Sequence, residues 1–174
     1  MTAPVLEHPP VAPPAQVAAP AATEPDLGPW IAFIRAHAAL TRRLEAELQE
    51  AAGVSLADYE ALLQLSLAGG RLRMNELADR LLLTRSGASR LVDRMADDGY
   101  VTRHKCATDA RGAFAVLTQA GHEHLERARP TAHEAISEHF LAVLPARDRA
   151  AFMRSLEAIL ERLDVGPAGD PSRC

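Results

Sequence analysis

The chain has 174 residues, which suffice for one compact domain and a tail but not for two independent cores. Hydrophobic residues make up 48% and aromatic residues 4%, so we expect a core of Ala, Leu, Val and Ile in closely packed helices. The net charge of −4 by itself argues against a nucleic-acid partner. The segment 80–111, however, holds seven cations and four anions, a net of +3, which leaves −7 for the remainder. A basic face on an acidic body is typical of a reversible DNA binder.

The two ends of the chain differ from its middle. Eight of the twelve prolines lie at or before Pro29, so residues 1–28 are expected to form a disordered tail rich in Pro and Ala. Residues 166–174 are expected to be a second flexible tail. The two cysteines, Cys106 and Cys174, suggest no disulfide framework. The chain shows neither a secretory signal nor an apolar run near the ~20 residues that cross a bilayer, so we expect a cytoplasmic protein without membrane contact.

The first two expected helices are separated by a glycine. Apolar residues at steps of three and four predict one long helix. These residues are Trp30, Phe33, His37, Leu40, Leu44 and Leu48. Gly53 should stop it, and Ser55 should cap a second helix, with Asp58 in its first turn. The second helix should end at Gly69-Gly70.

Two short helices and a hairpin are expected next. A third helix holds Leu77, although Arg73 stands where a Ser or Thr cap is usual, so its start is weakly specified. Thr84 should cap a fourth helix that ends near Gly99. The segments 100–103 and 113–117 then predict antiparallel strands joined by a turn over 108–112.

The last part of the chain is again helical. Thr118 should cap a long fifth helix, in which Pro130 is expected to cause a bend. The dipeptide Leu144-Pro145 should end that helix and precede a sixth. A helix-turn-helix followed by a basic hairpin is a device for reading duplex DNA.

Several motifs in this order resemble the MarR family of bacterial winged-helix regulators, over roughly residues 30–165. The motifs are Glu76-Leu77-Ala78, the run Ser89-Arg90-Leu91-Val92-Asp93-Arg94-Met95, Gly99-Tyr100-Val101, Asp109-Ala110-Arg111, Leu117-Thr118 and Gly121. Ala110 departs from the family pattern, which has a basic residue there. The resemblance implies a mainly α fold with a small β-wing, in a domain over 29–165. It also implies a winged helix-turn-helix DNA-binding lobe over about 55–118, with dimerisation helices over about 29–52 and 119–165.

The candidate DNA contacts lie on the fourth helix and the hairpin. Side chains from the first turns of a recognition helix meet base edges in the major groove, where Arg binds guanine and Ser binds base or phosphate. The candidates are Thr84, Arg85, Ser86, Ser89, Arg90, Arg94, Arg103, Lys105 and Arg111. Arg94 has an alternative as an internal ion-pair partner for an Asp. Arg111 is placed to enter the minor groove, while Asp109 and Gly112 are expected to shape the wing.

The expected partners are double-stranded DNA with a pseudo-palindromic operator, and a second copy of the chain. Long apolar stripes on the first, fifth and sixth helices exceed what the small lobe can cover, which favours a homodimer over a monomer with a helical cap. The resemblance implies a repressor that is released by a small aromatic or phenolic effector. The candidate ligand residues are His37, Arg42, Tyr59 and Arg90. For a histidine on an apolar stripe, a packed and hydrogen-bonded role is the commoner alternative.

Other functions remain as alternatives. Cys106 follows Arg103, His104 and Lys105, and cations favour the reactive thiolate, so a redox-responsive regulator is one alternative. A winged-helix module for architecture or protein contact, without a ligand, is another. We expect no enzyme, no cofactor and no metal site, because no nucleophile–base pair or phosphate loop is visible, and His122 and His124 do not share a helix face.

Overall fold

The computed structural model describes residues 26–105 and 113–165. Its helices and strands follow the expected order, with one added strand and a short π-helical turn. They are α1 Gly28–Ala52, α2 Leu56–Leu67, β1 Arg71–Arg73, α3 Met74–Arg80, α4 Arg85–Asp97, β2 Val101–Lys105, β3 Ala113–Leu117, α5 Gln119–Ile136, η1 Ser137–Leu141 and α6 Ala146–Arg162. The expected fold class, mainly α with a small β-wing, is confirmed.

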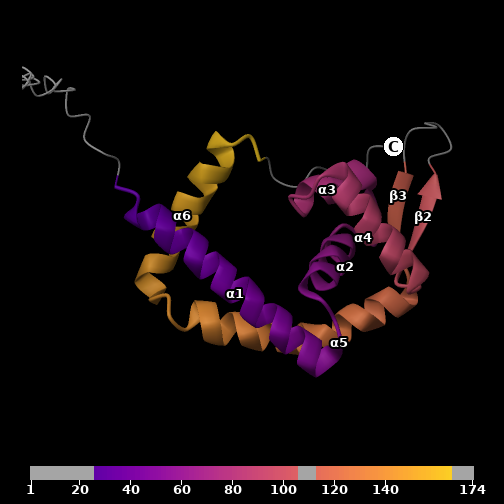
Figure 1. Cartoon of the computed structure of the whole chain (residues 1–174), viewed down its shortest axis with the longest axis horizontal. Helices are drawn as coiled ribbons and strands as arrows, with labels where there is room; N and C mark the ends of the chain where they lie inside the picture. Colours follow the sequence, from indigo (N-terminus) through magenta and orange to yellow (C-terminus); the bar gives the residue numbers. More distant parts are fainter. Residues whose placement is uncertain (1–25, 106–112, 166–174) are drawn as a thin grey trace, which may run out of the picture.

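The molecule has a small lobe at one end and a helical body that extends away from it (Figure 1). The small lobe consists of α2, α3, α4 and the sheet. Helices α1 and α5 pack against each other and lead from the lobe toward α6. The core lies where the lobe meets these two helices, and it joins Leu62 and Met95 of the lobe to Leu48 of α1 and Leu125 of α5.

Most helix ends follow from local sequence. Gly53 adopts a left-handed φ of 64° directly after α1, a conformation that costs glycine little. Ser55 Oγ accepts the Asp58 N–H at 3.1 Å, and Thr118 Oγ1 accepts the Gly121 N–H at 3.0 Å. The start of α3, which the sequence specifies weakly, is capped by another residue. The Glu76 carboxylate accepts a hydrogen bond from the backbone N–H of Arg73 at 3.2 Å. A carboxylate three residues into the helix thus replaces the missing side-chain cap.

The sheet has three strands in the order β1-β3-β2, whereas the sequence predicts only the hairpin. Strand β1 pairs antiparallel with β3, with Leu72 opposite Ala115. It is three residues long and its partner is more than forty residues away, so no local period reveals it. The guanidinium of Arg71 lies 3.7 Å from the centre of the Phe114 ring, which adds a cation–π contact to this edge.

Close packing of α5 against the lobe depends on Gly121. A Cβ atom at this position would lie 2.0 Å from the carbonyl oxygen of Tyr100. The Thr118 hydroxyl donates to the same carbonyl at 2.9 Å. The start of α5 is therefore held directly against the chain that links α4 to β2.

The second half of the helical body departs from the expected plan at one point. Helix α5 includes Pro130, but the α-helix ends at Ile136 and not at Leu144-Pro145. The π-helical turn η1 lies between the end of α5 and that dipeptide. The apolar stripes of α1 and α6 remain largely uncovered within one chain. Trp30 is 58% exposed, Ile159 54% and Leu163 65%.

Candidate nucleic-acid interface

Helix α4 has one buried face and one exposed face. The buried face packs into the lobe through Ala88, Leu91, Val92 and Met95. Arg85, Ser86 and Arg90 are exposed, and Ser89 is half-buried. Because the apolar face fixes the rotation of the helix, these polar side chains must point away from the protein.

The start of α4 is arranged for an anionic partner. Thr84 Oγ1 accepts the Gly87 N–H at 3.1 Å and lies 3.1 Å from Ser86 Oγ. Aligned peptide dipoles give this end of the helix a partial positive charge, which Arg85 reinforces. The first turn therefore combines a cation, two hydroxyls and a positive helix end, which suits a phosphate or a base edge.

Arg94 is an internal ion-pair partner in the described structure. Its Nη2 donates to Asp58 Oδ1 at 2.7 Å and its Nη1 to Asp58 Oδ2 at 2.9 Å. Asp58 is only 7% exposed and also accepts the Ser55 hydroxyl at 2.7 Å. The hydrogen bond to Asp58 raises the pKa of Arg94. Loss of Arg94 would leave a buried carboxylate without its cation, at a cost of about 1–3 kcal/mol.

The described part of the hairpin is tied to α4. Arg103 Nη1 donates to Asp93 Oδ1 at 2.8 Å and to Ser89 Oγ at 3.1 Å. The sequence suggested Arg103 only as a candidate DNA contact, and its partner Asp93 was missed because the two residues lie ten positions apart across a turn. Lys105 ends β2, and Cys106, Asp109, Arg111 and Gly112 lie outside the described residues.

The four candidate ligand residues are spread over three helices. His37 is exposed on α1 with its ring 6.3 Å from that of Phe33, whereas Tyr59 on α2 is buried. Arg42 and Arg90 are exposed, and within the described ranges no hydrogen bond or ion pair joins any two of the four. Burial raises the pKa of the Tyr59 phenol, and the charge of Arg129 on α5 opposes this rise. Helices α2 and α5, which carry Tyr59 and Arg129, pack against each other.

A buried histidine connects the lobe to α5. His124 is 5% exposed and stacks on Tyr100, with 4.0 Å between ring centroids. Arg127 Nη2 lies 2.7 Å from His124 Nδ1, and because an arginine only donates, this nitrogen must accept and the ring must be neutral. Burial, and then the charge of Arg127, lowers the pKa of His124, while Asp58 and Asp98 act in the opposite direction.

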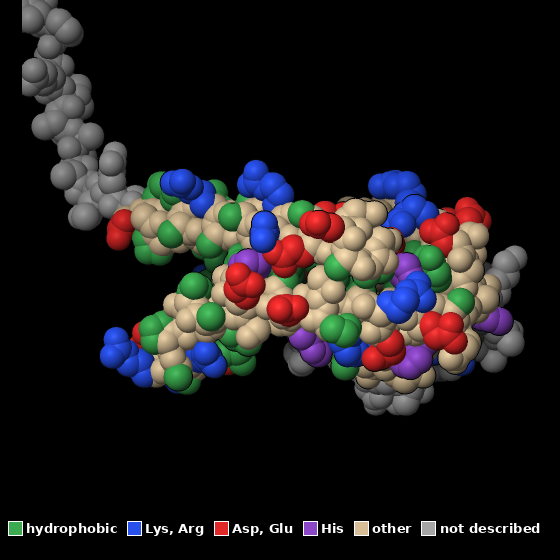
Figure 2. Space-filling view, turned by 90° about the horizontal axis from the view of Figure 1, so that it is seen from below, with side chains coloured by type: hydrophobic (Ala, Val, Ile, Leu, Met, Phe, Trp, Pro, Cys, Tyr) green, Lys and Arg blue, Asp and Glu red, His purple; other side chains and the backbone are tan. Residues whose placement is uncertain are grey.

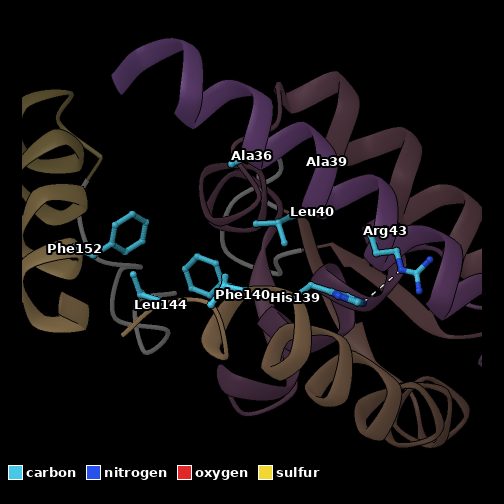
Figure 3. A pocket seen from close by; sticks show the side chains of 9 residues that line it. Ala36, Ala39, Leu40, Arg43, His139, Phe140, Leu144 and Phe152 are labelled. Atoms are coloured by element: carbon cyan, nitrogen blue, oxygen red, sulfur yellow. Dashed lines mark hydrogen bonds between the residues drawn. The ribbon is translucent and has the colours of Figure 1, made fainter. Parts of the chain in front are cut away.

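A groove opens at the other end of the molecule. Figure 2 shows a hollow between the start of α1 and a second arm formed by α6, with hydrophobic side chains along both. The groove has a volume of about 470 Å³ and is lined by Leu40 of α1, Phe140 of η1 and Phe152 of α6, among others. Arg43 and His139 stand at one side of it (Figure 3). The hydrogen bond from His139, followed by the charge of Arg43, lowers the pKa of Glu47, which joins these two side chains.

Two features are absent from the described ranges 26–105 and 113–165. No group of three or more His, Cys, Asp or Glu side chains is placed to hold a metal ion. No helix there combines the length and the apolar composition needed to cross a membrane.

Comparison with known proteins gives a consistent result. The profile of the MarR family matches residues 52–112. The structure superimposes on AbsC, a MarR family transcriptional regulator from Streptomyces coelicolor, with a TM-score of 0.75 and 32% identity, over 83% of this chain and 97% of that one. Sco3205, a MarR family regulator from the same organism whose structure contains DNA, superimposes with a TM-score of 0.74 and 33% identity. The match covers 82% of this chain and 89% of that one.

A curated relative carries a more specific name. The transcriptional repressor MprA of Escherichia coli K12 is 26% identical over 68% of this chain and 67% of its own. Another curated relative, a Bacillus subtilis regulator, is matched over only 55% of its length.

The His124 contact predicts a pH-dependent stability. A histidine whose pKa is lowered on folding stabilises the protein above its ordinary pKa of 6.5, and this contribution is lost as the pH falls below that value. We expect the free energy of unfolding, measured by urea titration between pH 8 and pH 5 or so, to fall less in His124→Gln than in the parent. His122→Gln, an exposed position on the same helix, serves as the control. Parallel losses in the parent and in His124→Gln would contradict the prediction.

Proposed function

Because the chain belongs to the MarR family of DNA-binding transcription regulators, which are not enzymes, we propose that it is a homodimeric repressor of a pseudo-palindromic operator. The observation that carries this proposal is the exposed polar face of α4. That face presents Arg85, Ser86 and Arg90 beside a capped helix start, with an apolar face directly opposite.

In this proposal the two ends of the interface read different grooves. Helix α4 enters the major groove, where Arg85 and Arg90 bind guanine or phosphate and Ser86 and Ser89 add polar contacts. Arg111 enters the neighbouring minor groove, whose narrow A·T segments attract an arginine. In this proposal Arg94 takes no part in base contact, because its bidentate pair with Asp58 holds the guanidinium against the start of α2.

A dimer accounts for the apolar surface of the helical body. Trp30, Phe33 and Ile34 on α1, Ile159 on α6 and Leu163 directly after α6 are exposed apolar side chains. They belong to the two arms whose residues line the groove, and a partner helix packed against these arms would bury both stripes. A two-fold axis through this region would also present two recognition helices to successive turns of the duplex. Repression follows if the bound dimer excludes transcription proteins from the operator, and the name of MprA supports this direction.

A small anionic aromatic effector is the proposed signal. The proposed location is the junction of α1, α2 and α5, helices that pack against one another and carry His37, Tyr59 and Arg129. An aromatic acid lodged there would bind by stacking and charge-assisted hydrogen bonds. It would release DNA by turning the lobes, because a small change in their spacing spoils both groove contacts together. The redox alternative rests on Cys106.

The base-reading role of α4 predicts a loss of both affinity and selectivity. Arg85→Ala should weaken binding to a duplex selected from random DNA by about 1–3 kcal/mol and relax the preference at one base pair per half-site. Binding is measured by fluorescence anisotropy at fixed salt. Arg35→Ala, an exposed cation on α1, should bind as the parent does. An Arg85→Ala protein with parental affinity and selectivity would remove α4 from the major groove.

The dimer proposal predicts a change in mass without a loss of fold. Ile159→Asp combined with Leu163→Asp should give a monomer in light scattering, because two charges would be buried at the interface. These side chains are exposed in one chain, so the helical circular dichroism should persist. Ala158→Asp, on the polar face of α6, is the matched control and should stay dimeric. A dimer in both variants would refute this placement of the interface.

The effector proposal predicts selective release. Aromatic carboxylates and phenols titrated into the protein–operator complex should dissociate it, and His37→Ala should raise the concentration required. His133→Ala, exposed on α5, is the control. Equal sensitivity of the parent and His37→Ala would exclude His37 from the site. If peroxide dissociates the protein–operator complex and none of the aromatic compounds does, the results would favour redox sensing at Cys106 over effector binding.

A further inference from the structure

Arg103 connects strand β2 to the recognition helix through a single nitrogen. Its Nη1 lies 3.1 Å from Ser89 Oγ and 2.8 Å from Asp93 Oδ1. Ser89 and Asp93 are four residues apart on α4 and therefore share one face of the helix. An Nη1 group carries two hydrogens, and these two contacts use both of them.

This arrangement limits what each of the three side chains can offer to DNA. The carboxylate of Asp93 offsets the charge of Arg103, so the pair adds little net attraction for phosphate. Ser89 Oγ already accepts from Arg103, which leaves its own hydrogen available for donation. Major-groove acceptors for such a donor are guanine N7 and O6, adenine N7 and thymine O4.

The exposed position of Asp93 is otherwise unfavourable. It lies on the DNA-facing helix with a side chain that is 58% exposed, where a negative charge repels the phosphate backbone. Removal of that charge alone would be expected to strengthen binding. The ion pair with Arg103 explains why an acidic residue at this position can favour DNA binding although its charge repels phosphate.

We propose that Arg103 and Asp93 are a positioning pair that sets the wing against the recognition helix and fixes Ser89 as a hydrogen-bond donor to a base edge. The inference rests on the proposed reading of DNA by α4, and it deepens that function. Neither Arg103 nor Asp93 touches DNA in this arrangement. Ser89 makes the contact, and the pair determines its direction.

The decisive variant is Asp93→Asn in the full-length protein, tested against a duplex selected by the parent from random sequence. It should bind about two- to fivefold more weakly than the parent, the range that exposed ion pairs contribute, although it removes a negative charge. Asp97→Asn is the matched control, because Asp97 is exposed one turn further on and makes no ion pair among the described residues. The control should bind as tightly as the parent or more tightly.

A double-mutant cycle separates positioning from direct contact. Arg103→Gln and the double variant with Asp93→Asn should each lose about as much affinity as Asp93→Asn alone, with an unchanged salt dependence. Ser89→Ala and Arg103→Gln should relax the preference at the same base pair in a repeated selection. The alternative is that Arg103 binds a phosphate. Then Asp93→Asn would bind at least as tightly as the parent, and Arg103→Gln would reduce the salt slope by about one.

Arg85→Ala, run in the same assay, distinguishes two failures. Loss of binding in Arg85→Ala with parental binding in Asp93→Asn would overturn only the positioning pair. Parental binding in both variants would overturn the reading of DNA by α4, and the pair with it. Circular dichroism of each variant confirms that weaker binding does not reflect unfolding.

Discussion

The ion pair between Asp58 and Arg94 holds the recognition helix in place, and the rest of the interface depends on it. Two parallel N–H···O bonds join the start of α2 to the last turn of α4, and the Ser55 cap supplies a third donor to the same carboxylate. Apolar packing of Val92 and Met95 sets the rotation of α4, but packing alone tolerates sliding. A bidentate pair has a fixed geometry, and it therefore also sets the position of α4 along its axis.

Contact between the small lobe and α5 is equally direct. Gly121 permits α5 to approach the Tyr100 carbonyl, Thr118 bonds that carbonyl, and His124 stacks on the Tyr100 ring. Tyr100 also precedes strand β2, which carries Arg103. A displacement of α5 would therefore reach the wing and α4 through contacts with little room to absorb it, since packed interiors transmit strain. In the proposed function, these contacts would carry a change in the helical body to the residues that bind DNA.

The sequence by itself determined the elements whose signals are local. The Gly53 stop, the Ser55, Thr84 and Thr118 caps and the buried face of α4 all follow from residues within one or two turns of each other. The winged-helix class followed because helix, turn, helix and hairpin occur in a fixed order with a recognisable set of motifs. The exposed candidates Arg85, Ser86 and Arg90 followed from the opposite face of α4. The sequence also narrowed Arg94 to two roles without choosing between them.

Only the tertiary structure decided the features that join distant segments. Strand β1, the choice of Asp58 as the partner of Arg94, and the bond from Arg103 to Asp93 and Ser89 link residues 10 to more than 40 positions apart. Neither helical nor strand periodicity encodes such pairs, because each depends on how the elements pack. The sequence does not distinguish His124 from the other histidines of α5. Only the structure shows that it is buried and that it contacts Tyr100 and Arg127. Local sequence thus specifies the helices, caps and strands. Packing between them decides which charged side chains form internal ion pairs and which remain exposed to a DNA partner.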